Sequence, residues 1–114
     1  MAAPAPSLGE FEQLVLLALV RLGDDGYGVS IHQEILRRAR REVSVAAVYK
    51  TLDRLEQKGL AVSVLGEPTP ERGGRRKKYF RIQPAGRRVL KASLASIGRM
   101  ADGLAGTPAF DIEP

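Results

Sequence analysis

The sequence contains no cysteine and no tryptophan, and its only histidine is His32. Without cysteine it can form no disulfide, no thiolate zinc site and no cysteine nucleophile, and one histidine cannot complete a metal site or a nucleophile–base pair. Asp24 and Asp25 are adjacent between glycines, where turn formation accounts for them. We therefore expect no enzyme activity, no metal and no cofactor.

Long hydrophobic runs are also missing. The apolar run over residues 14–20 is much shorter than the roughly 20 residues that a membrane-spanning helix needs, and no signal peptide precedes it. The lack of cysteine is compatible with a reducing compartment. These features predict a cytoplasmic protein that does not associate with a membrane.

Acidic residues are missing from one long stretch. Residues 72–99 contain ten lysines and arginines and no aspartate or glutamate, in a chain whose formal net charge is +5. Such segregation is typical of a surface that binds phosphates, although a solvated surface would have the same composition. The charge pattern therefore indicates a polyanionic partner.

The length of 114 residues, with 44% hydrophobic residues, fits a single domain. Residues 1–7 and 105–114 are rich in Ala, Pro and Gly and are expected to be disordered tails. A first helix is predicted over residues 8–22, and Ser7 and Glu10 have the spacing of a capping box. Its apolar residues lie all around the circumference, so it must be covered on more than one side, and a second copy could provide part of that cover.

A second helix is predicted over residues 29–41, after the glycine-rich turn at residues 23–28. Its last turn holds four arginines, Arg37, Arg38, Arg40 and Arg41. They could simply complement the helix dipole, or they could contact a ligand, and the sequence leaves both readings open.

A third helix is predicted between Ser44, as N-cap, and Gly59, as C-cap. Val48, Leu52 and Leu55 fall on one face, which we assign to the core. The opposite face carries Ala47, Lys50, Arg54 and Gln57. Its small and cationic side chains would allow close approach to another molecule.

Strands are predicted over residues 60–66 and 77–83, and the glycines, prolines and cations between them indicate a β-hairpin with a basic tip. Pro84 suits the first position of a last helix over residues 84–104, whose apolar residues recur at heptad spacing. This seam could dock on a second copy or pack on its own domain. The predicted dimer interface consists of Phe11, Val15, Leu90, Leu94, Ile97, Ala101 and Leu104.

This order of elements, mostly α with a small β-hairpin, is that of a winged helix-turn-helix plus a C-terminal dimerisation helix. Residues 8–83 would form a DNA-binding domain and residues 84–104 the dimerisation helix. In this fold the third helix enters the major groove of double-stranded DNA, and the hairpin, or wing, meets the phosphate backbone. The predicted contacts are Ser44, Ala47, Tyr49, Lys50, Thr51 and Arg54 on the helix, and Arg72, Arg75, Arg76 and Lys77 on the wing.

The segments "GYG", "AAVYKTLDRLEQKGL" and "GGRRKKYFRIQPAGRRVL" resemble the PadR family of bacterial transcriptional regulators. The resemblance implies a homodimeric repressor that binds a pseudo-palindromic operator, and it leaves open release by a small apolar ligand. Gln83–Pro84 and the single short terminal helix depart from the usual pattern. A winged-helix module that binds protein or RNA is the alternative function.

Overall fold

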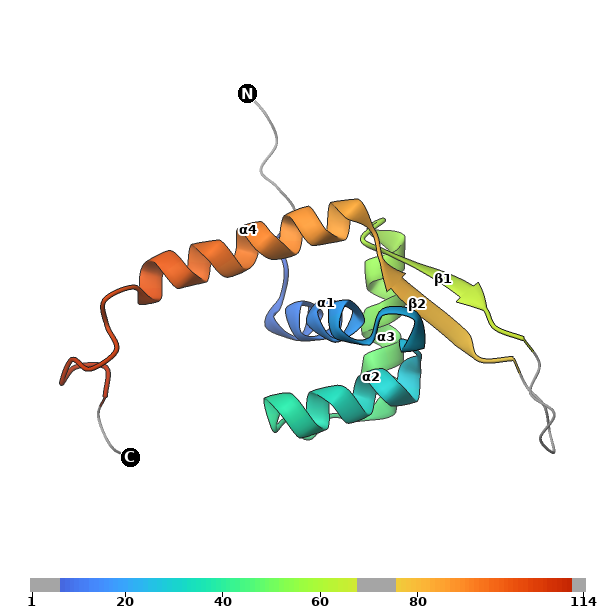
Figure 1. Cartoon of the computed structure of the whole chain (residues 1–114), viewed down its shortest axis with the longest axis horizontal. Helices are drawn as coiled ribbons and strands as arrows, with labels where there is room; N and C mark the ends of the chain where they lie inside the picture. Colours follow the sequence, from blue (N-terminus) through green and yellow to red (C-terminus); the bar gives the residue numbers. More distant parts are fainter. Residues whose placement is uncertain (1–6, 68–75, 112–114) are drawn as a thin grey trace, which may run out of the picture.

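The computed structural model describes residues 7–67 and 76–111. Three helices pack together, an antiparallel hairpin extends from them, and a last helix crosses over the top and projects beyond the body (Figure 1). The elements are α1 (Glu10–Leu22), α2 (Gly28–Glu34), α3 (Val45–Gln57), β1 (Ala61–Leu65), β2 (Lys78–Ile82) and α4 (Pro84–Ala101), with a short 3-10 turn η1 (Gly23–Asp25) and a π-helical turn η2 (Ile35–Ala39). The predicted winged helix-turn-helix architecture is confirmed.

The core lies where α1, α2 and α3 meet the inner face of the hairpin. The predicted apolar face of α3 is buried. The largest fully buried side chains are Val15, Leu16, Leu19, Ile31, Val48, Leu52, Leu55 and Phe80. Phe11, Leu14 and Leu17, on other sides of α1, are only partly buried. The chain's own core therefore explains part of the apolar circumference of α1, and the rest stays accessible.

Two residues assigned to the dimer interface belong to this core instead. Val15 is 0% exposed and Leu90 is 4% exposed within a single chain. Leu90 lies in the part of α4 that packs on its own domain. The apolar heptad positions available to a partner therefore begin at Leu94. The prediction of an intermolecular role was wrong for these two residues.

The start of α1 also differs from the prediction. Gly9 is the N-cap, and its N–H donates to the Glu12 carboxylate at 2.9 Å. Glu12 can reach this amide because it lies three residues after the cap. Ser7 lies before the helix, and Glu10 is its first residue. The predicted capping pair was therefore displaced by two residues.

Both ends of α3 form as predicted. The Ser44 hydroxyl accepts a hydrogen bond from the Ala47 N–H at 3.0 Å. At the other end Gly59 has a φ of +73°, and the N–H groups of Gly59 and Leu60 donate to the carbonyls of Glu56 and Leu55. This is a Schellman termination, which favours glycine at the left-handed position. It turns the chain directly into β1.

The hairpin is anchored to the helical body at its stem. β1 pairs with β2 so that Ser63 faces Phe80 and Val64 faces Tyr79. Tyr27 forms an isolated bridge with Tyr79, and the Phe80 N–H donates to the Gly26 carbonyl at 2.7 Å. The glycine-rich turn before α2 thus pairs with β2 on the side away from β1 and holds the wing against the helical body.

The last helix begins at Pro84 as predicted but ends at Ala101, so Leu104 lies in the following turns. Of the described residues after Leu90, none is buried. No helix in the described part of the chain is long and apolar enough to span a membrane.

The junction between α4 and the hairpin depends on Gly86. A Cβ atom added there would lie 2.2 Å from the Leu60 carbonyl oxygen, which is backbone and cannot move aside cheaply. We expect Gly86→Ala to lower the free energy of unfolding by about 1–3 kcal/mol, as other overpacking substitutions do. Urea denaturation would measure it. Gly98→Ala in the same helix is the control, because its Cβ meets open space and should leave stability equal or higher.

Candidate nucleic-acid interface

The outer face of α3 presents few and mostly small or cationic side chains. Ala46, Lys50 and Arg54 are exposed, and Ala47 is half-buried beside them. Ser44 is exposed at the N-terminus, where its hydroxyl already accepts the Ala47 N–H. The helix can therefore approach another molecule closely at its N-terminal end.

Tyr49 connects α3 to the start of α2. Its side chain is 41% exposed, and its ring lies so close to Gly28 that a Cβ atom there would come within 2.2 Å of the ring carbon Cζ. Because Gly28 has no side chain, the phenol ring of Tyr49 can pack directly on it. The sequence pattern identified both residues but gave no indication that they touch.

Thr51 does not lie on this face. It is 2% exposed, and its hydroxyl accepts a long hydrogen bond of 3.4 Å from Arg54. One turn of helix separates it from Val48 and Leu55, so its direction is set by the core. The prediction that the Thr51 hydroxyl contacts a phosphate is not compatible with this position.

The C-terminal half of α3 is tied to α1 by a buried carboxylate. Glu12 accepts a hydrogen bond from Lys58 at 2.8 Å and lies 3.5 Å from the Arg54 Nε atom. Burial opposes ionisation of Glu12, but the hydrogen bonds from Lys58 and the Gly9 N–H, with the nearby Arg54, hold its pKa below the usual value. The contact with Glu12 thus helps to fix the position of the Arg54 side chain. Sequence reasoning missed Glu12 because its partner Lys58 lies 46 residues away.

The structure describes the base of the wing but not residues 68–75. Arg72 and Arg75 lie outside the described residues, whereas Arg76 and Lys77 are exposed. The Lys77 ammonium lies 4.4 Å from the centre of the Tyr27 ring, which itself packs edge-on against Tyr79. This contact brings the first cations of the wing next to the start of α2.

The cationic side chains on the stem of the wing contact other residues of the same chain. The Lys78 ammonium lies 5.4 Å from the centre of the Phe80 ring and 3.8 Å from Glu56. Arg81 forms an ion pair with Asp24 in the turn before α2. These two residues brace the hairpin.

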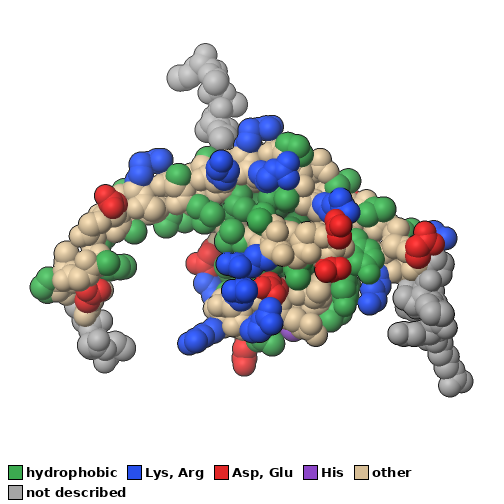
Figure 2. Space-filling model, viewed as in Figure 1, with side chains coloured by type: hydrophobic (Ala, Val, Ile, Leu, Met, Phe, Trp, Pro, Cys, Tyr) green, Lys and Arg blue, Asp and Glu red, His purple; other side chains and the backbone are tan. Residues whose placement is uncertain are grey.

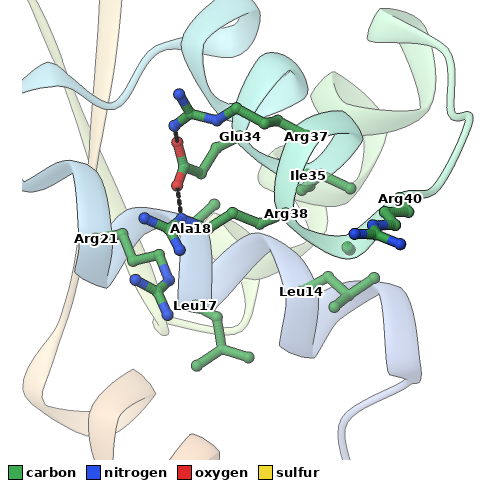
Figure 3. A pocket seen from close by; sticks show the side chains of 10 residues that line it. Leu14, Leu17, Ala18, Arg21, Glu34, Ile35, Arg37, Arg38 and Arg40 are labelled. Atoms are coloured by element: carbon green, nitrogen blue, oxygen red, sulfur yellow. Dashed lines mark hydrogen bonds and ion pairs between the residues drawn. The ribbon is translucent and has the colours of Figure 1, made fainter.

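The arginines at the end of α2 and η2 are held locally. Glu34 accepts hydrogen bonds from Arg37 at 2.7 Å and Arg38 at 2.6 Å (Figure 3). The hydrogen bond from Arg38 contributes most to keeping the pKa of Glu34 below its usual value. Arg41 pairs with Glu10, and His32 hydrogen-bonds the Val43 carbonyl at 2.6 Å, which fastens the loop before α3.

The structure thus connects one predicted helix contact, Tyr49, to the base of the wing through the start of α2. Tyr49 touches the start of α2, Tyr27 precedes it, and Lys77 covers Tyr27. A continuous surface therefore runs from the outer face of α3 across the N-terminus of α2 to the wing. Within the described ranges, 7–67 and 76–111, no cluster of three His, Asp or Glu residues could hold a metal ion.

Comparison with known proteins identifies the family. Residues 16–92 match the model of the transcriptional regulator PadR-like family. This match covers more than half of the chain, so the chain belongs to the PadR-like family. It is a transcriptional regulator by class and not an enzyme. No match was found among curated proteins.

Solved structures of similar fold include three bacterial regulators. A PadR family regulator from Eggerthella lenta is 28% identical, with a TM-score of 0.63 and coverage of 83% of this chain and 82% of that chain. A transcriptional regulator from Clostridium thermocellum is 25% identical, with a TM-score of 0.67 and coverage of 82% and 84%. A PadR-like regulator from Bacillus cereus is 19% identical and matches in fold, with a TM-score of 0.70 and coverage of 90% and 93%.

The contact between Tyr49 and Gly28 can be tested by filling the space. In Gly28→Ala the new methyl group displaces the outer end of the Tyr49 ring, which is free to move toward solvent. We expect little change in thermal stability but DNA binding weaker by about tenfold or more, the value of one hydrogen bond to a charged group such as a phosphate. Tyr49→Phe, which keeps the ring and removes the hydroxyl, should weaken binding to a similar extent. Unchanged DNA affinity in both variants would contradict a role for Tyr49 at the interface.

The Glu12 network predicts a pH-dependent contribution to stability. Because the pKa of Glu12 is lower in the folded chain, its stabilisation is present above the unfolded pKa of about 4.3 and is lost as the pH falls through the folded pKa. Glu12→Gln should lower the free energy of unfolding by about 1 kcal/mol at pH 7, since Lys58 is partly solvated. Denaturation at pH 7 and pH 3 measures the difference, which should shrink at pH 3. An equal difference at both values would contradict the ionic origin.

Proposed function

We propose that this chain is a homodimeric repressor that binds a pseudo-palindromic operator in double-stranded DNA. The observation that carries the proposal is the continuous surface from α3 to the wing, joined by the contacts of Tyr49 with Gly28 and of Lys77 with Tyr27. A winged helix needs this continuity, because its helix and its wing must reach neighbouring parts of one duplex. The site of action would be the cytoplasm.

Each part of the surface has a chemical role in the proposal. Ala46 and Ala47 let the start of α3 enter the major groove, and Lys50 reaches base edges or phosphates. Ser44 and Tyr49 contact the backbone at the border of the groove. Arg72, Arg75, Arg76 and Lys77 of the wing neutralise phosphates. Arg54 contributes from the far end of α3, where Glu12 restrains it.

Dimerisation is supported by apolar surface that a single chain leaves uncovered. Leu94 and Ile97 of α4 are exposed, as are Ala101 and, in the following turn, Leu104. Figure 2 shows hydrophobic side chains along the side of the projecting half of α4 that faces α1. On α1, Phe11 is only partly buried. Burial of these residues against a second copy would follow the hydrophobic effect.

Two-fold symmetry then dictates the operator. An isologous dimer presents two copies of α3 related by a two-fold axis, so it binds two inverted half-sites about one helical turn apart. A dimer seated there can exclude other proteins from a promoter, which is the physical basis of repression. A small apolar ligand that releases the DNA would act at the dimer interface, since a shift of one copy against the other changes the spacing of the two helices.

The direct test is a titration of the purified full chain on the DNA upstream of its own gene. Binding should survive an excess of unrelated competitor DNA, and a footprint should show two protected half-sites about one helical turn apart. Repression is tested by transcription from that promoter with and without the protein. Binding that competitor removes equally well would overturn sequence-specific recognition and would favour a protein or RNA partner.

Point substitutions separate base reading from phosphate binding. Lys77→Ala should lower the slope of log affinity against log salt by about 1 and leave sequence preference unchanged. Lys50→Ala should reduce the preference for operator over unrelated DNA by about 1–3 kcal/mol if Lys50 reads a base. Lys91→Ala, an exposed lysine of α4, is the matched control and should change neither quantity. Equal effects of all three substitutions would indicate only a general dependence on net charge.

A further inference from the structure

A groove between α1 and the end of α2 is not used by the proposed DNA interface. It has a volume of about 480 Å³. Leu14, Leu17 and Ile35 form its apolar lining, and Arg21 and Arg40 lie at its two ends (Figure 3). With Arg37 and Arg38, four arginines line the groove against one acidic residue, Glu34. The groove thus combines an apolar floor with a positive rim, which suits an acidic segment that also carries apolar side chains.

The chain contains one segment with this composition. Residues 102–113 include three acidic residues and no lysine or arginine, in a chain that is otherwise basic. The acidic residues are Asp102, Asp111 and Glu113. Phe110, next to Asp111, is 57% exposed, although a large aromatic side chain favours burial. The segment and the groove are therefore complementary in both charge and hydrophobicity.

The fold keeps this segment away from the groove of its own chain. The last buried residue of α4 is Leu90, and the helix continues to Ala101, about 16 Å further at 1.5 Å per residue. Figure 1 shows α4 projecting past the side of the body on which α1 begins and η2 ends, with the C-terminal segment standing clear of the body. A second copy that covers the projecting half of α4 would bring its own groove to this side.

We propose that residues 102–111 of one copy dock in the arginine-lined groove of a second copy. Phe110 packs on Leu14 and Leu17, and the acidic side chains pair with Arg21 and Arg40 at the rim. This inference rests on the proposed homodimer and adds an exchanged segment to it. It also gives a reason for keeping four arginines near an apolar surface that does not face the DNA.

The absence of cysteine from the sequence allows a direct test by disulfide trapping. Ala39→Cys places a thiol at the groove, and Ala109→Cys places one beside Phe110. Under mild oxidation the double variant of the full chain should form a covalent dimer, with a 39–109 linkage identified by mass spectrometry. The two single variants and the pair Ala46→Cys with Ala109→Cys are controls and should stay largely monomeric on a non-reducing gel.

Each outcome has a distinct meaning. A 39–109 linkage within one chain would overturn exchange between copies. A protein that is dimeric in solution, by analytical ultracentrifugation, but forms no 39–109 linkage would overturn the docking and leave the proposed homodimer intact. A protein that is monomeric throughout would overturn both the docking and the homodimer.

Charge reversal tests the same contact without oxidation. Asp102→Lys with Asp111→Lys, or Arg21→Glu with Arg40→Glu, should each raise the dimer dissociation constant about tenfold, and combining all four should restore it. Arg88→Glu with Arg99→Glu is the control, because helical spacing puts both on the side of α4 opposite Leu90. If the groove variant weakens DNA binding at an unchanged dimer constant, the arginines contact DNA and the docking is wrong.

Discussion

The packing of the apolar face of α3 on α1 determines what the rest of the molecule can do. Val48 and Leu55 are fully buried together with Leu16 of α1, so the opposite face of α3 has only one direction in which to point. Burial of each such side chain is worth roughly 1.5–3 kcal/mol, which outweighs any single polar contact at the surface. The orientation of the proposed recognition helix is therefore a consequence of the core.

Smaller polar contacts set the positions of the wing and of the loop before α3 relative to that core. The Gly26 carbonyl accepts the Phe80 N–H, and His32 hydrogen-bonds the Val43 carbonyl. Glu12 joins the far end of α3 to the start of α1 through Lys58. These contacts are individually modest, but each connects two elements whose relative position sets the shape of the proposed DNA surface.

Local signals in the sequence were sufficient to predict the fold. Ser44 and Gly59 bracket α3 because a side-chain cap and a left-handed glycine act within a few residues, and Pro84 marks the start of α4 in the same way. Two errors were local, the displaced capping pair of α1 and the earlier end of α4, and the others concern contacts between distant residues. Thr51 and Leu90 were assigned to intermolecular surfaces because helical spacing identifies a face but not what covers it. Glu12 and the arginine-lined groove could not be predicted, since their parts come together only in the folded chain.

The central claim is that α3 and the wing form one surface for DNA. It is tested most directly by amide chemical-shift changes in the ¹⁵N-labelled protein during titration with a duplex of about 20 base pairs, long enough for two half-sites. The account predicts that the largest changes fall on residues 44–54, on the start of α2 and on residues 76–79, with small changes near Arg21 and Arg40. Changes concentrated on α4 or on the groove between α1 and η2, with α3 unaffected, would contradict it.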